Sequence, residues 1–274
     1  MMHFIGIAIA AIAIIIWLVL LQLQSDRREQ LLQKPLPDEW IRILQDNVPL
    51  YSLLPGDLKA TLHGCIHLFL HEKEFFGCNG LEITNQIRLT IAGNASILLL
   101  KRDNHRFKGF TTILVYPDTY VADEVKHDGM VVTHQQTARS GESWHRGPVV
   151  LSWSDIMNDR LQEHKGHNVI LHEFAHKLDE ENTIMDGLPV LRNDADYKEW
   201  AQVLTKEYAE LKKRVSKGTN TVLDEYAITS PPEFFAVATE SFFEKPQAMQ
   251  NKLPELYVQL KKFYGLDPAS WTSS

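Results

Sequence analysis

Two histidines one helical turn apart, His172 and His176, lie within an otherwise mostly apolar segment, residues 169–178. Glu173 follows the first of them, so the segment has the pattern His-Glu-x-x-His. A four-residue spacing places both histidine side chains on one face of a helix, where two imidazole nitrogens can reach the same atom. Polar groups among apolar neighbours are costly without partners, which favours a shared metal ion over two solvent-facing histidines.

This pattern predicts a catalytic zinc site. Such a site takes three protein ligands and keeps one position for water. His172 and His176 are expected to supply two of the ligands. Glu173 is not a ligand in this pattern, but it lies where it can accept a proton from the attacking water and pass it to the leaving amine. The expected reaction is hydrolysis of peptide bonds by a metal-activated water, with one Zn²⁺ per chain.

The third ligand has to come from elsewhere in the chain. The extended pattern with a third histidine is excluded, because Asp179 and Asn182 stand where it requires Gly and His. Glu233 follows Ser230 and two prolines, which is typical of a helix start, and Glu240 lies two turns further along the same face. We expect Glu233 to bind the metal and Glu240 to orient a histidine. A capping role for Glu233, and the reverse assignment of the two carboxylates, are the alternatives.

Other polar residues have weaker claims to a role. Tyr226, shortly before the helix of Glu233, can donate its phenolic hydrogen to a developing oxyanion, although a core tyrosine is equally compatible with the sequence. His63, His67 and His71 recur at every fourth position, but no carboxylate accompanies them. We interpret these three histidines as a partly exposed helix face.

The beginning of the chain differs from a globular domain. Residues 4–21 are apolar throughout, and at about 1.5 Å per residue such a helix nearly crosses a hydrocarbon core of roughly 30 Å. A cleaved signal peptide is disfavoured because there is no charged n-region and no small-x-small cleavage site. The run therefore predicts a transmembrane anchor over residues 1–24. Arg27 and Arg28 follow it, which favours an inner-membrane protein whose C-terminal part faces the cytoplasm, with a cytoplasmic protein as the alternative.

The remaining sequence predicts one folded domain. Residues 25–37 end in Lys34-Pro35-Leu36-Pro37 and are expected to form a short tether before a catalytic domain over residues 38–274. Between residues 110 and 151, runs rich in β-branched residues predict a small sheet. Helical spacing elsewhere makes the expected fold class α+β and predominantly helical. Helices are expected at 57–74, after Thr84, and at 153–163, 167–178, 196–215, 231–243 and 255–264.

Charge and cysteine content exclude some classes of protein. The formal net charge is -7, and no basic stripe of the kind that follows a phosphate backbone is present, so no nucleic-acid partner is expected. Cys65 and Cys78 are the only cysteines, which is too few for a disulfide framework.

Three motifs together resemble the Mlc titration factor A family of zinc peptidases. They are residues 172–179, residues 141–144 with 147–153, and residues 224–227 leading into 232–237. The resemblance covers residue 36 to the C-terminus and implies a bacterial, zincin-like catalytic domain. It also implies that the two motif histidines and Glu233 bind zinc. The active site is similar to the catalytic domain of anthrax lethal factor, where a tyrosine seven residues before the glutamate ligand assists catalysis, as Tyr226 would here.

The resemblance also bears on activity and partners. It implies aminopeptidase-type activity on a peptide or protein substrate, and a transcriptional regulator as a further partner. A rival hypothesis is a membrane-tethered binding module that sequesters such a regulator, with zinc mainly structural. Three ligands and a glutamate placed as a base favour catalysis, because a structural zinc site normally has four protein ligands.

Overall fold

The computed structural model describes residues 2–103, 105–118, 120–128, 131–139, 141–143, 147–161 and 166–271. For residues 2–3, 5–11 and 120–143 it describes the backbone alone. Its centre is a four-stranded sheet in the order β1-β2-β6-β5. Ile113, Val115, Val149 and Leu151 lie on one face of its two central strands and are fully buried. The alternate residues of β2 are partly exposed, so the sheet is buried more deeply on one face than on the other. The strands are β1 (Glu74–Gly77), β2 (Thr112–Tyr116) and β6 (Val149–Ser152), which are parallel, and β5 (Gly141–Ser143), which is antiparallel to β6.

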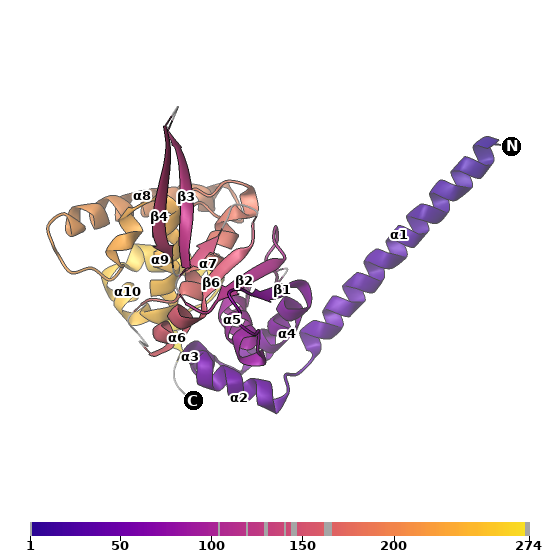
Figure 1. Ribbon diagram of the computed structural model, residues 1–274, viewed down its shortest axis with the longest axis horizontal. Helices are drawn as coiled ribbons and strands as arrows, with labels where there is room; N and C mark the ends of the chain where they lie inside the picture. The colour runs from indigo at the N-terminus through magenta and orange to yellow at the C-terminus, as the bar shows by residue number, and fades with distance from the viewer. Residues whose placement is uncertain are drawn as a thin grey trace.

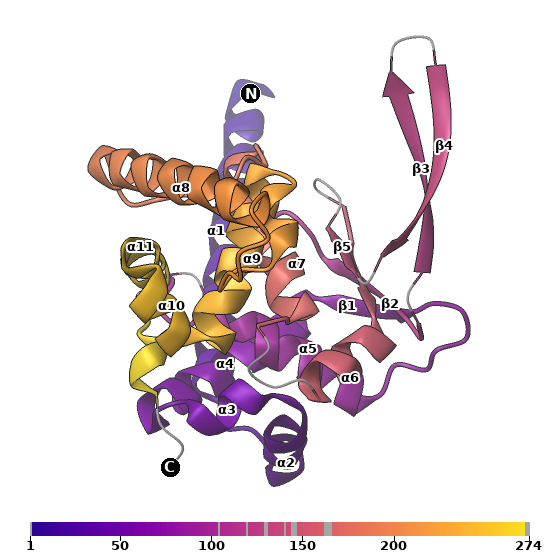
Figure 2. The same cartoon turned by 90° about the vertical axis from the view of Figure 1, so that its left-hand side faces the viewer.

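Helices make up most of the chain. Figure 2 shows α7 between the sheet and the C-terminal helices α8 to α11, and α7 contacts both β5 and α9. The helices are α2 (Asp38–Asn47), α3 (Pro49–Leu53), α4 (Gly56–Glu72), α5 (Asn85–Ile97), α6 (Trp153–Leu161), α7 (Val169–Asp179), α8 (Asp194–Val215), α9 (Pro231–Glu244), α10 (Pro246–Lys252) and α11 (Pro254–Tyr264), with short 3₁₀ turns η1 (Glu180–Asn182), η2 (Glu225–Ile228) and η3 (Pro268–Ser270).

Side-chain caps fix where α7, which carries the two histidines, and α9, which carries Glu233, begin. The side chain of Asn168 accepts a hydrogen bond from the backbone N–H of Leu171, and Ser230 accepts one from that of Glu233. Each cap satisfies an N–H that has no partner within its own helix. The aromatic ring of Phe174 then holds α7 in the core, since it packs against the rings of Phe107, Phe69 and Phe110 at 4.8 to 5.9 Å.

A long hairpin stands apart from the central sheet. Strands β3 (Tyr120–Asp128) and β4 (Val131–Arg139) pair antiparallel with each other and form their own two-stranded sheet. The hairpin projects from the rest of the molecule (Figure 1).

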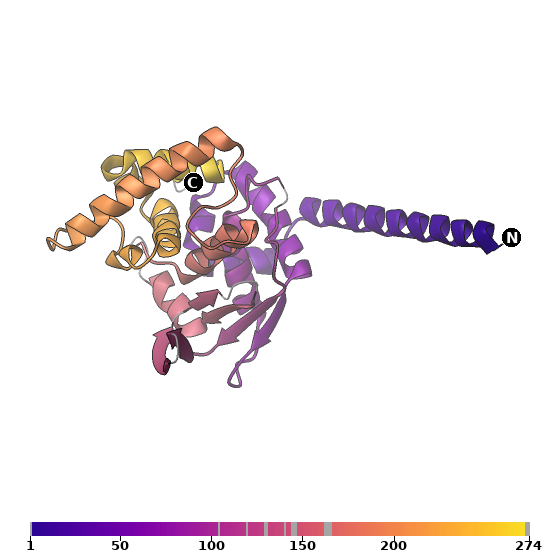
Figure 3. The same cartoon turned by 90° about the horizontal axis from the view of Figure 1, so that it is seen from above.

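The first helix, α1 (Met2–Gln33), extends from the body as a single rod (Figures 1 and 3). Its last turns pack on α4, where a Cβ at Gly64 would overlap the backbone of Leu32. Arg28 also lies 3.8 Å from Glu72 of α4.

The expected transmembrane part of the fold class is wrong. Among the described residues, no helix combines the length and apolarity needed to cross a membrane. The apolar run lies in α1, which is a single helix of 32 residues. The helix then continues through charged residues to its contact with α4. The inner-membrane location inferred from that span is left without support.

Candidate metal centre

The structure brings His172, His176 and Glu233 together, as the sequence predicts. His172 and His176 lie on α7, and Glu233 lies in the first turn of α9. Oε2 of Glu233 is 2.9 Å from Nε2 of His172 and 3.4 Å from Nε2 of His176, and the two nitrogens are 3.2 Å apart. Within the described part of the chain, these three residues form the one group of His, Cys, Asp or Glu side chains arranged to hold a metal ion.

The geometry of this group fits a metal ion better than a set of hydrogen bonds. Oε2 of Glu233 is buried and has no hydrogen-bond partner, although two ring nitrogens lie close to it. Ligands of a tetrahedral Zn²⁺ with bonds of about 2.0 to 2.2 Å lie about 3.3 Å from one another. The three separations in the cluster scatter about that value, and two imidazoles with one carboxylate are a donor set that zinc accepts.

Glu240 supports His172 from the other nitrogen of its ring. Its Oε1 lies 2.7 Å from Nδ1 of His172, and its Oε2 accepts a hydrogen bond of 2.7 Å from the backbone N–H of Asn168. The side chain is only 2% exposed. A carboxylate on Nδ1 fixes the orientation and tautomer of the ring and leaves Nε2 to face the cluster. Glu233 therefore lies at the ring nitrogen that faces the cluster, and Glu240 lies at the other nitrogen of the same ring.

Burial and the neighbouring charged groups shift the pKa values of the cluster in opposite directions. Burial lowers the pKa of His172, but Glu240 and Glu233 more than offset this and hold that pKa well above its usual value. Burial dominates for His176 and lowers its pKa. Burial raises the pKa of Glu233, but its contacts with His172 and His176 more than offset this and hold the pKa well below its usual range. An ionised Glu233 and a neutral His176 are in the protonation state that a cation requires of its ligands, whereas His172 must give up a proton when a cation binds.

The two residues expected to act on substrate occupy different environments. Glu173 is 4% exposed on α7, directly after His172. Tyr226 lies on η2, is 52% exposed, and its ring centre is 6.2 Å from that of His172. Asp224 caps η2 by accepting the backbone N–H of Tyr226. The tyrosine is therefore not a core residue and stands beside the cluster on its exposed side.

The other candidates are accounted for by contacts within the fold. The backbone N–H of Glu233 is capped by Ser230, while its carboxylate is turned toward the histidines. Nε2 of His63 lies 2.9 Å from the hydroxyl of Tyr51, and Nε2 of His67 lies 3.1 Å from the carbonyl of Pro35. Residue 144 of the second motif lies outside the described residues.

One supporting residue was missed in the sequence. Asn168 caps α7, donates its backbone N–H to Glu240, and donates its side-chain amide to Glu244 at 2.9 Å and to Asn94 at 3.2 Å. Its position directly before an apolar helical run is an N-cap signal that the sequence does carry. The side-chain contacts, which join α5, α7 and α9, depend on the tertiary fold.

Comparison with known proteins places the chain in a family. The family described as glucose-regulated metallo-peptidase M90 matches residues 22–265. A protein of Synechocystis sp., named Uncharacterized protein slr2042, is 42% identical over 88% of this chain and 89% of its own length. Mlc titration factor A of Salmonella arizonae is 31% identical over 81% of this chain and 89% of its own, and that of Escherichia coli O127:H6 is 31% identical over 81% and 84%. The resemblance found in the motifs is confirmed, and the chain belongs to the glucose-regulated metallo-peptidase family M90.

Proposed function

We propose that the protein is a zinc-dependent peptidase in which His172, His176 and Glu233 bind one Zn²⁺. The observation that carries this proposal is the convergence of three ligand atoms at 2.9 to 3.4 Å with a buried Glu173 on the same helix. Three protein ligands leave a position for water, which distinguishes a catalytic site from a closed structural one. Membership of a metallo-peptidase family supports the same reaction class.

Each residue of the site then has a defined task. Bound zinc would polarise the scissile carbonyl and lower the pKa of water. Glu173 accepts a proton from the attacking water and delivers it to the leaving nitrogen. Tyr226, on the exposed side of the cluster, donates a hydrogen bond to the oxygen on which negative charge develops. Glu240 keeps Nε2 of His172 aimed at the metal.

We further propose that the peptidase acts as an aminopeptidase. Binding of a regulator is a separate candidate function. The relatives at 31% identity are named Mlc titration factor A, and this name favours a second candidate function, the binding of a transcriptional regulator with zinc mainly structural. The two functions differ in whether the zinc protein hydrolyses any peptide.

The decisive experiment compares the full-length wild type with Glu173→Gln. Zinc content is measured by mass spectrometry, and hydrolysis is measured with amino-acid p-nitroanilides and internally quenched peptides. We expect one zinc in both proteins and a loss of hydrolysis of about 10² to 10⁴-fold in the variant. Glu207→Gln, on α8, removes the same charge and should leave both quantities unchanged. A metal-replete wild type without zinc would refute the proposal, and a zinc protein without peptidase activity would favour the binding module.

A further inference from the structure

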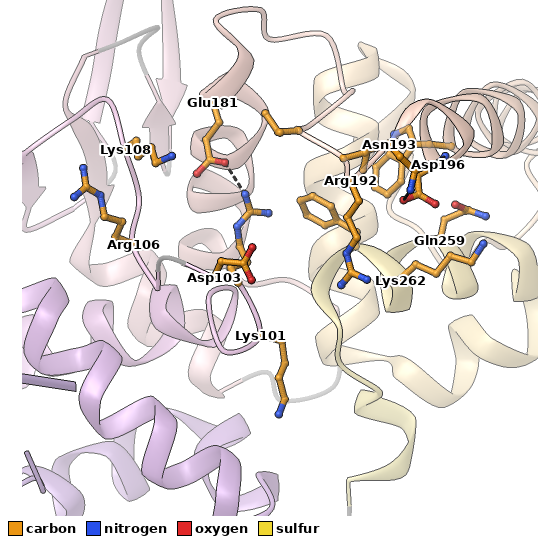
Figure 4. Close-up of a pocket in the computed structure, with 15 residues that line it drawn as sticks. Lys101, Asp103, Arg106, Lys108, Glu181, Arg192, Asn193, Asp196, Gln259 and Lys262 are labelled. Atoms are coloured by element: carbon orange, nitrogen blue, oxygen red, sulfur yellow. Dashed lines mark hydrogen bonds and ion pairs between the residues drawn. The ribbon is translucent and has the colours of Figure 1, made fainter. Parts of the chain in front are cut away.

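A concave cavity lies apart from the metal cluster. Its volume is about 600 Å³, and it is bounded by the segment after α5, by η1, by the start of α8 and by α11 (Figure 4). None of His172, His176, Glu233, Glu240 and Tyr226 lines it. Concave sites of about 300 to 1,000 Å³ are typical of small-molecule binding, whereas protein partners usually meet flatter surfaces.

Positive charge is concentrated in this cavity. The lining includes three acidic residues, Asp103, Glu181 and Asp196, and twice as many basic ones. The chain as a whole carries a formal charge of -7, so the excess of cations is local. A cleft lined mostly by one sign of charge concentrates ions of the opposite sign. The basic residues are Lys101, Arg102, Arg106, Lys108, Arg192 and Lys262.

Half of these cations have no ion pair within the described part of the chain. Lys101, Lys108 and Arg192 form none, whereas Lys262 pairs with Glu199 at 2.5 Å. In Figure 4, Arg192 extends into the space between the segment of Lys101 and the helix of Lys262. These three cations line the cavity at separate points, and without partners in the described part of the chain their charge is available to a ligand.

Arg102 gives the cavity a fixed element. Its guanidinium is held by Glu181 at 2.5 Å and lies 5.2 Å from the ring centre of Phe263. The side chain is only 19% exposed. A guanidinium fixed in this way loses little side-chain entropy when a further acceptor binds.

We propose that this cavity binds a small organic anion that carries at least two negative charges. Arg192, Lys101 and Lys108 neutralise its phosphate or carboxylate groups, since arginine and lysine both bind such groups. The carbon skeleton of the ligand packs on the apolar part of the lining, which includes Leu191 and Phe263. Val190 contributes a further apolar surface and is 41% exposed.

Isothermal titration calorimetry with the full-length protein tests this proposal. Glycerol 3-phosphate serves as the phosphate probe and citrate as the carboxylate probe, so the two arms distinguish the sources of the charge. At least one probe should bind with a dissociation constant below about 1 mM at low ionic strength, and should bind more weakly as salt is added.

Paired variants locate the binding. The double variant Lys101→Ala/Arg192→Ala should weaken binding at least tenfold. The control double variant Lys213→Ala/Lys217→Ala, at and just beyond the far end of α8, should change binding less than twofold. Both doubles remove two positive charges from exposed positions, so their melting temperatures should match. Absence of binding for both probes at about 10 mM, or equal weakening in the two doubles, would overturn the proposal.

Discussion

Glu240 holds His172 from Nδ1 at 2.7 Å while Glu233 meets Nε2 of the same ring at 2.9 Å. The two carboxylates thus lie on different sides of one imidazole. Glu233 faces the cluster of candidate ligands, and Glu240 is buried between α7 and α9. This relationship predicts different consequences when either carboxylate is removed.

Zinc affinity separates the two glutamates. Glu233→Ala removes a ligand, and zinc should be lost during dialysis against a weak chelator. Glu240→Ala leaves three ligands but releases the ring of His172, so the affinity should fall by about 10 to 100-fold without complete loss. Competition with a fluorescent zinc chelator measures both. Retention of zinc by Glu233→Ala together with its loss from Glu240→Ala would mean that the roles are reversed.

The placement of the candidate ligands was largely predictable from local sequence signals. The spacing of His172 and His176 defines one helix face, and Ser230 marks the start of the helix that carries Glu233. These are contacts within a few residues, which helical periodicity determines. The helix expected after Thr84 is likewise confirmed, because Thr84 caps Ile87 at the start of α5.

Features that depend on distant segments were not predictable. The parallel pairing of β1 with β2 spans the segment that holds α5, and that of β2 with β6 spans the segment that holds β3, β4 and β5, so neither pairing is local. Strand β1 is also too short to be recognised from its own sequence. The apolar run at the start of the chain was judged by hydropathy alone, which does not register the docking of the same helix on Gly64. The cavity beside Arg192 gathers cations from three separate segments, so no single stretch of sequence carries a signal for it.

The hydroxyl of Tyr226 should matter for the reaction and not for the fold. Tyr226→Phe removes one hydrogen-bond donor from the exposed side of the cluster, and kcat should fall by about 10 to 10³-fold if this donor meets the developing oxyanion. Zinc content and KM should change little, because this role acts on the developing oxyanion and not on the metal or the ground-state substrate. Tyr197→Phe, on α8, is the matched control, since its hydroxyl accepts a hydrogen bond from Leu191. An unchanged kcat in Tyr226→Phe would remove this residue from the catalytic set.

The contact between α1 and α4 depends on the absence of a side chain at Gly64. A methyl group at this position would overlap the backbone of Leu32, so Gly64→Ala should displace the end of α1 from α4. We expect a cost of about 1 to 3 kcal/mol in this contact and faster amide exchange in residues 27–37. Gly56→Ala, in the same helix, meets nothing within 4 Å and serves as the control. Equal exchange rates in the two variants would show that α1 does not depend on this close approach.

Asp179, fully buried at the end of α7, should make stability depend on pH. Burial raises its pKa from 3.8 to about 7, while the backbone N–H of Gly187 partly offsets this by donating to Oδ2. Because the folded state binds this proton more tightly than the unfolded chain, the contribution is fully present below about pH 4 and is lost as the pH rises through about 7. Asp179→Asn cannot ionise and retains an oxygen for Gly187, so it should gain stability relative to wild type over that range, by at most about 4 kcal/mol. Urea denaturation at pH 4.5 and pH 8 measures the difference. Asp103→Asn, at an exposed position, is the control, and its free energy of unfolding should equal that of wild type at both pH values. If the difference in free energy of unfolding between Asp179→Asn and wild type is the same at both pH values, Asp179 ionises normally in the fold.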